Sequence, residues 1–90
     1  MKIQNPILYC CYNRIDLIKK SIQILQDIEC KKIYISIDGP KNNQEEKKKN
    51  IEIIKYIQSI KFNSQLDILI RKENLGCKIA ISDAINWFFK

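Results

Sequence analysis

The sequence contains no histidine, only two glycines and two prolines, and its basic residues include just two arginines. Without histidine the chain lacks the commonest general base and the commonest nitrogen ligand of zinc. Its four cysteines include no C-x-x-C pair, so no common zinc site is indicated. Adjacent Cys10 and Cys11 would point to opposite faces of a strand, and we expect reduced thiols that act as small core residues.

Long apolar runs and enzyme motifs are also missing. No run reaches the ~18 residues of a membrane helix, and the opening MKIQNPILYCCYNR lacks the core and cleavage site of a signal peptide. There is no Gly-rich phosphate loop and no G-x-S-x-G motif. The adjacent carboxylates Glu45 and Glu46 fit a solvated helix start. We expect a cytoplasmic protein with no membrane segment, which in a longer form could dock on the cytoplasmic face of a membrane.

Size and charge restrict the possibilities further. The chain has 90 residues, which predicts at most one domain, residues 1–90. Its formal net charge is +6, from 16 basic and 10 acidic residues. The basic residues are mostly lysine and do not alternate with exposed aromatics, so a nucleic-acid partner is not predicted. Salt-sensitive RNA binding through the lysines remains an alternative.

Short apolar runs alternate with stretches of helical periodicity. Strands are predicted at residues 6–12, 31–38 and 64–71. Three helices are predicted between and after them, with apolar faces formed by Ile15, Ile18, Ile22 and Leu25, by Ile53, Ile54, Ile57 and Ile60, and by Cys77, Ile81, Ala84 and Phe88 with Ala80 and Trp87 beside them. The order β-α-β-α-β-α predicts an α/β fold, with three βα units forming a parallel sheet through right-handed crossovers.

The arrangement of the strands indicates whether the sheet is complete and where a ligand would bind. In the order 3-2-1 the first strand is an edge, although its apolar residues suit a strand with two neighbours. We therefore expect a further strand beyond Lys90 and an incomplete domain. Ligands of such sheets bind at the carboxyl ends of the strands, where the loops 12–14, 38–40 and 71–76 are predicted to lie.

Each of these loops admits a structural and a functional interpretation. Asn13 is a candidate N-cap, whereas Arg14 at a helix start could contact phosphate and Tyr12 could flank a base. Asp38 before Gly-Pro is either a turn former or a carboxylate that contacts a base or ribose. If it serves mainly in binding, Asp38→Ala should weaken nucleotide binding and leave the thermal midpoint nearly unchanged.

The third loop, RKENLGCKIA, has the same two interpretations. Asn74, Leu75 and Gly76 could simply join a strand to a helix, with Gly76 supplying an unusual φ. Alternatively Arg71, Asn74, Gly76 and Lys78 lie together at the rim, where cations and a close backbone approach suit a diphosphate.

The stretches PILYCCYNR, YISIDGPKN and RKENLGCKIAISDAINWFF, in this order, resemble the first three βα units of family 2-like glycosyltransferases with the GT-A fold. The resemblance covers nearly the whole chain. It implies a Rossmann-like half-domain that binds a nucleotide-sugar donor, usually a UDP-sugar. It also implies nucleotide contacts from Tyr12, Asn13, Arg14, Asp38, Gly39, Arg71, Asn74, Gly76 and Lys78. Ile15 and Ile37 replace a proline and a serine that many relatives have.

The resemblance also implies parts that these 90 residues do not contain. The family's D-x-D or E-D-D signature, which holds Mg²⁺ or Mn²⁺ on the diphosphate, follows the next strand. The acceptor site and the catalytic base come later still. We therefore expect the metal and a glycan or lipid-linked acceptor only in a longer enzyme, and an inactive isolated chain. The main alternative is a non-catalytic, flavodoxin-like α/β interaction module. A receiver domain is disfavoured because Tyr12-Asn13-Arg14 supplies no acidic cluster.

Overall fold

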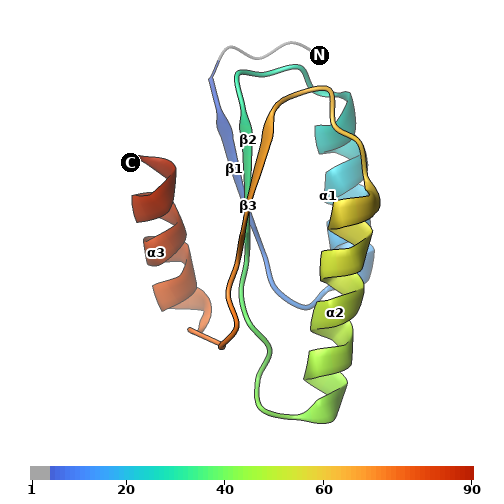
Figure 1. The fold of residues 1–90 in the computed structure, drawn as a ribbon, viewed down its shortest axis with the longest axis vertical. Coiled ribbons are helices and arrows are strands. Elements are labelled where there is room, and N and C mark those ends of the chain that lie inside the picture. The colour runs from blue at the N-terminus through green and yellow to red at the C-terminus, as the bar shows by residue number, and fades with distance from the viewer. Residues whose placement is uncertain (1–4) are drawn as a thin grey trace.

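The computed structural model describes residues 5–90, except for the side chain of Cys77. Strands and helices alternate as predicted, in the order β1 (Ile7–Cys11), α1 (Ile15–Asp27), β2 (Ile33–Ile37), α2 (Gln44–Ser59), β3 (Leu66–Ile70) and α3 (Cys77–Phe88). Residues 1–4, which begin the stretch predicted not to be a signal peptide, lie outside the described part. The chain is thus a small α/β unit made of three βα repeats (Figure 1).

The sheet has three parallel strands, as predicted, in the order β1-β2-β3, which is the arrangement that places the first strand at an edge. The strands are in step: Cys11 lies opposite Ile37, and Ile37 lies opposite Ile70. All three therefore end at the same level, and within the described residues β1 pairs with β2 alone. This in-step register brings the three following loops to one edge of the sheet.

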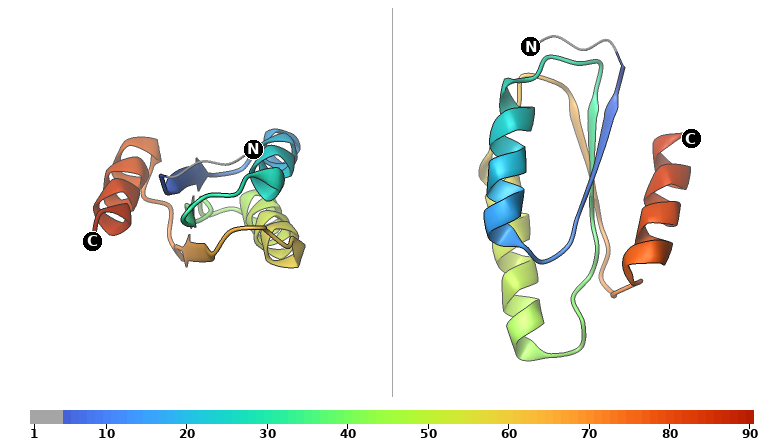
Figure 2. Two further views of the ribbon diagram at one scale, coloured as in Figure 1. Left: turned by 90° about the horizontal axis from the view of Figure 1, so that it is seen from above. Right: turned by 180° about the vertical axis from the view of Figure 1, so that it is seen from behind.

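The helices cover the two faces of the sheet unequally. Helices α1 and α2 lie side by side on one face and α3 lies alone on the other (Figures 1 and 2). Alternate residues Ile33, Ile35 and Ile37 of β2 point into the core formed with α1 and α2. The predicted faces of both helices are confirmed: Ile18, Ile22, Leu25, Ile53 and Ile57 are buried and Ile15, Ile54 and Ile60 pack against them. Each fully buried isoleucine contributes about 1.5–3 kcal/mol, so this layer dominates stability.

Helix α3 approaches the sheet through small and aromatic residues. Ala80 and Ala84 are buried, and the ring of Tyr34 on β2 makes edge contacts with Trp87 and Phe88. The predicted face of this helix is wrong at Ile81, which is 41% exposed. Because the small Ala80 and Ala84 let the helix backbone approach the sheet, the contact line shifts by one residue and Ile81 turns outward. The predicted position of Cys77 on that face lies outside the described side chains.

The helix starts differ from the prediction in one respect. Arg14, rather than Asn13, occupies the N-cap position of α1, and its side chain makes no capping hydrogen bond. Asn13 lies one residue before the cap, and its amide nitrogen donates to the Glu46 carboxylate. By contrast, α2 has a true cap, since the side chain of Asn43 accepts a 2.9 Å hydrogen bond from the Glu46 N–H.

Candidate functional site

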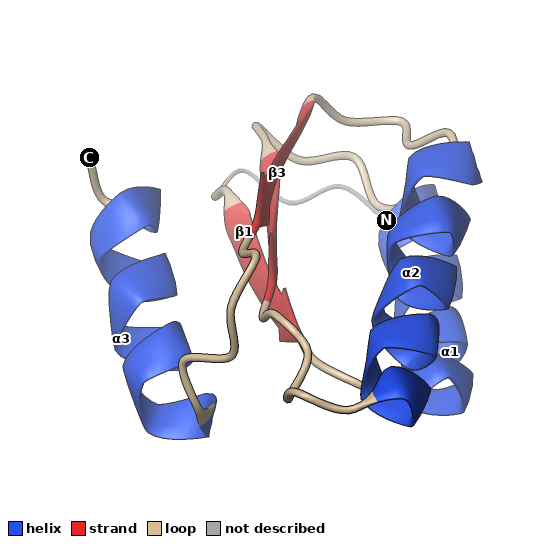
Figure 3. Ribbon diagram, turned by 60° about the horizontal axis from the view of Figure 1, so that its bottom comes forward, coloured by secondary structure: helices blue, strands red, loops and turns tan. Residues whose placement is uncertain are grey.

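The carboxyl ends of the strands form a continuous edge, which Figure 3 brings forward. The ladder extends one residue past β2 and past β3: the Asp38 N–H donates to the Cys11 carbonyl at 3.1 Å, and the Arg71 N–H donates to the Ile37 carbonyl at 3.1 Å. The three loops that follow the strands therefore begin side by side, as the sequence predicts. What each side chain does there depends on contacts between loops.

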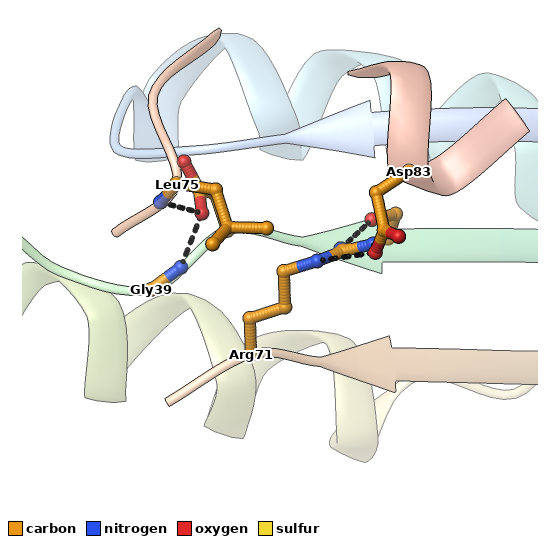
Figure 4. Close-up of polar contacts among 6 residues, drawn as sticks. Gly39, Arg71, Leu75 and Asp83 are labelled. Carbon is orange, nitrogen blue, oxygen red and sulfur yellow. Dashed lines mark hydrogen bonds and ion pairs between the residues drawn. The ribbon is translucent and has the colours of Figure 1, made fainter. Parts of the chain in front are cut away.

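Asp38 joins two of these loops. One carboxylate oxygen accepts hydrogen bonds from the Gly39 N–H at 2.8 Å and the Leu75 N–H at 3.0 Å. The other accepts from the Asn74 amide at 3.2 Å. Figure 4 shows the Gly39 and Leu75 nitrogens converging on one carboxylate oxygen. With Asp38 only 6% exposed, these bonds hold the β3–α3 loop to the end of β2, and we no longer expect Asp38→Ala to leave stability unchanged.

The backbones of the same two loops are in close contact. The Asn74 amide also donates to the Gly39 carbonyl at 3.0 Å. A Cβ atom on Gly39 would collide with the main chain of Glu73, so only glycine fits at this position. Gly76 has φ 82° and ψ 152°, a conformation that is essentially restricted to glycine, and this lets the chain turn into α3.

The β1–α1 loop is held from the other side by Glu46. The Tyr12 hydroxyl donates to the Glu46 carboxylate at 2.8 Å, and the Asn13 amide donates to both of its oxygens at 3.2 Å. Partial burial and this hydrogen bond to Glu46 raise the pKa of Tyr12 to about 12. The bonds from Tyr12 and Asn13 in turn lower the pKa of Glu46. The prediction that Glu46 belongs only to a solvated helix start is therefore wrong.

A pocket of about 320 Å³ opens at this edge. Four of the nine predicted site residues line it: Tyr12, Asp38, Asn74 and Gly76. The remaining lining residues are Cys10, Cys11, Lys41, Ala80 and Ile81. The pocket thus combines apolar walls from β1 and α3 with a carboxylate, a phenol, an amide and one lysine.

The other predicted residues do not line this pocket. Arg71 turns toward α3: its guanidinium pairs with Asp83 and donates to the Ser36 hydroxyl at 2.6 Å (Figure 4). Its side chain is only 9% exposed, so it braces α3 against the sheet. Asn13 is engaged by Glu46, Gly39 contacts the neighbouring loop, and Arg14 and Lys78 are exposed.

Sequence reasoning missed several residues of the pocket and its supports. Lys41 lies two residues after the Gly39 turn, yet its sequence context is an ordinary polar loop. Asn50 donates from α2 to the Asp38 carbonyl at 3.0 Å and is buried, and a lone polar residue on the apolar face of a helix was the only signal of this role. Ile81 lines the pocket and is not buried among the core residues of α3, contrary to the predicted helix face.

The described residues of this edge offer neither a reactive thiolate nor a cluster of metal ligands. Burial raises the pKa of the Cys11 thiol to about 12, with a smaller contribution from Cys10, so this sulfur stays protonated at neutral pH. Among the described residues, no three acidic, cysteine or histidine side chains gather closely enough to hold a metal ion. Asp38 is the only carboxylate lining the pocket, and its oxygens already accept three hydrogen bonds, so a divalent cation does not fit these residues alone.

Comparison with protein-family models, with curated proteins and with solved structures found no match. What this edge binds must therefore be argued from its geometry. Within residues 5–90, none of the helices has the length and apolar character needed to cross a bilayer.

Proposed function

We propose that this chain is the nucleotide-binding part of a glycosyltransferase that uses a nucleotide-sugar donor, with a UDP-sugar as the first candidate. The observation that carries the proposal is the pocket at the carboxyl edge of the sheet. Tyr12, Asp38, Asn74 and Gly76, which come from three separate loops, line it together. This edge is where open parallel sheets bind their ligands.

The chemistry of the pocket suits a nucleoside. Ala80 and Ile81 offer an apolar wall to the flat face of a base, and Tyr12 supplies an aromatic edge. The Asp38 oxygen that accepts only the Asn74 amide keeps lone-pair capacity for a base N–H or a ribose hydroxyl. Lys41 at the mouth supplies a positive charge for a phosphate. A volume of about 320 Å³ lies at the small end of ligand pockets, which fits a nucleoside better than a whole nucleotide sugar.

The transfer itself would need residues beyond these 90. In the proposed enzyme an acceptor hydroxyl, on a glycan or a lipid-linked acceptor, displaces the nucleoside diphosphate from the anomeric carbon. A bound Mg²⁺ or Mn²⁺ would neutralise that leaving group. The present residues bind and orient the nucleoside. We place the enzyme in the cytoplasm, where reducing conditions keep thiols such as Cys11 and Cys30 unpaired.

The proposal is tested by titrating the labelled chain with UDP and following backbone amide shifts. We expect the largest shifts at Tyr12, Asp38, Asn74 and Gly76. Uridine should shift the same amides, because base and ribose occupy the pocket, whereas inorganic phosphate should leave Tyr12, Asp38 and Gly76 unshifted. Shifts confined to the opposite end of the sheet, or no shifts at all, would remove the proposal.

A matched pair of lysine variants sharpens the test. Lys41→Gln should weaken UDP binding about threefold, the typical worth of one exposed charge contact. Lys55→Gln, an exposed lysine of α2 outside the pocket, makes the same charge change and should leave UDP binding unaltered. Equal losses in both variants would mean that UDP responds only to net charge.

One observation favours the alternative of a non-catalytic interaction module. Helix α3 and the residue after it expose four large apolar side chains, Ile79, Ile81, Ile85 and Phe89. Ile81, Ile85 and Phe89 are spaced four residues apart and so lie along one side of the helix, a pattern typical of protein-binding surfaces. If Ile85→Glu abolishes self-association in sedimentation experiments, and no nucleotide shifts the pocket amides, the module is the better description.

A further inference from the structure

A second depression lies beside the pocket, beyond the contact between Asp38 and Asn74. It measures about 510 Å³ and is lined by Pro40, Lys41, Asn42, Lys47, Lys72, Glu73 and Asn74. Its three lysines come from three segments: the β2–α2 loop, the first turn of α2 and the β3–α3 loop. We call it the lysine groove.

The lysines of this groove form no close ion pair within the described residues, although Lys41 lies near enough to Glu46 to help lower the pKa of that carboxyl. In the described part of the chain, ion pairs join only Lys32 to Asp67 and Arg71 to Asp83. The one acidic side chain in the groove, Glu73, therefore lies more than ion-pair distance from Lys41, Lys47 and Lys72. Three like charges are held around one depression and are offset by Glu73 in the lining and by Glu46 near Lys41, so the local charge remains positive.

The floor of the groove is fixed. The backbone of Glu73 packs directly on Gly39, and the Asn74 amide donates to the Gly39 carbonyl at 3.0 Å. The groove also runs beside the first turn of α2, since Lys47 and Asn42 both line it. The positive end of a helix dipole adds to the field of the lysines there. Because these two loops are held together, the backbone positions of Lys41 and Lys72 are set before a ligand binds.

We propose that the lysine groove binds a phosphate-bearing anion, most simply a diphosphate, and does so without a nucleoside in the neighbouring pocket, with which it shares Lys41 and Asn74. A lysine ammonium group binds phosphate as a point charge with three hydrogen-bond donors. Three such groups around one depression suit a compact anion. The groove has no aromatic side chain, so it offers no platform for stacking a base. Its ligand is therefore recognised by charge, and the site goes beyond the proposed function.

The test is a titration of the labelled chain with inorganic pyrophosphate, followed by amide shifts. We expect shifts at Lys41, Asn42, Lys47, Lys72 and Glu73. The double variant Lys47→Gln/Lys72→Gln should weaken binding about tenfold, or about threefold for each exposed charge. The control Lys20→Gln/Lys55→Gln removes the same two charges from exposed helix positions outside the groove and should bind as wild type.

A further variant tests the sign of the charge. Glu73→Gln removes the only acidic side chain of the groove and should tighten pyrophosphate binding about threefold. Equal weakening in the groove and control double variants, or no response to Glu73→Gln, would overturn the site. Shifts that spread over lysines of all faces would do the same.

Two further experiments are needed. One distinguishes a discrete diphosphate from a nucleic-acid backbone as the ligand, and the other distinguishes this site from the nucleoside pocket. A short single-stranded RNA competing for the same amides, with higher affinity than pyrophosphate, would identify a nucleic-acid backbone as the ligand and exclude a discrete diphosphate. If pyrophosphate binds and UDP leaves the pocket amides unshifted, the proposed nucleotide function fails while the lysine groove stands. If uridine shifts the pocket and pyrophosphate shifts nothing, the reverse holds.

Discussion

Replacing Asp38 by alanine tests the structural role assigned to its carboxylate. The change leaves the Gly39 and Leu75 N–H groups without their acceptor at a position that is only 6% exposed, while the Asn74 amide keeps its bond to the Gly39 carbonyl. An unsatisfied buried donor costs about 1–3 kcal/mol, so the two together should cost about 2–4 kcal/mol. That is a large part of the stability of so small a domain.

Urea unfolding measured by tryptophan fluorescence suits this prediction. Trp87 is the single tryptophan, and it contacts Tyr34 across the interface between α3 and the sheet. With a slope of about 1 kcal/mol per molar urea, typical of a small domain, the midpoint should fall by about 2 M or more. Asp67→Ala, an exposed residue paired with Lys32, should change stability by less than about 1 kcal/mol.

Asp38→Asn keeps the measurement informative if the alanine variant does not fold. Its side-chain oxygen can still accept from Gly39 and Leu75, but its amide group then faces the Asn74 amide, donor against donor. We expect a loss smaller than that of alanine, about 1–2 kcal/mol. An unchanged midpoint in Asp38→Ala would refute the reasoning and show that this residue serves only in the turn or in binding.

Three other perturbations have expected outcomes. Gly39→Ala should lose about 1–3 kcal/mol in urea unfolding, because its methyl group would overlap the Glu73 main chain. Glu46→Gln should lower the pKa of Tyr12 from about 12 toward its ordinary 10.0 in ultraviolet titration of tyrosinate. In the wild type, the raised pKa means that this contact is intact below pH 10.0 and is lost as the pH rises through about 12. Cys11, whose thiol pKa is about 12, should resist alkylation at pH 8 until urea unfolds the chain, as measured by mass spectrometry of the labelled peptide.

Much of the fold could be predicted because its signals are local and periodic. The recurrence of Ile18, Ile22 and Leu25 predicts the buried face of α1, and the structure confirms it. The parallel sheet and the shared carboxyl edge follow from the alternation of strands and helices. Ile81 was misplaced because two alanines decide how closely α3 approaches the sheet, and a helical period alone does not encode that distance.

The individual roles at the site depend on long-range partners, which a sequence pattern does not specify. Asparagine commonly caps helices, but Asn13 lies one residue before the cap and its amide donates to Glu46, 33 residues away. Arg71 follows a strand, where a ligand contact is expected, yet it pairs with Asp83 one helix later. In both places a side chain with several possible partners takes the one that the tertiary fold brings near. Which of the nine predicted residues contact a nucleotide stays a prediction.

The contacts of the β3–α3 loop have a consequence for its motion. Loop amides usually exchange their protons with water quickly, but the Leu75 N–H is held by a carboxylate and the neighbouring main chain packs on Gly39. Its exchange should therefore be slow and should accelerate only with unfolding of the sheet edge. A ligand arriving at this edge would meet loops that are already ordered, so it would lose little conformational entropy on binding. Association would then be governed by diffusion and orientation, with no slow step of loop closure.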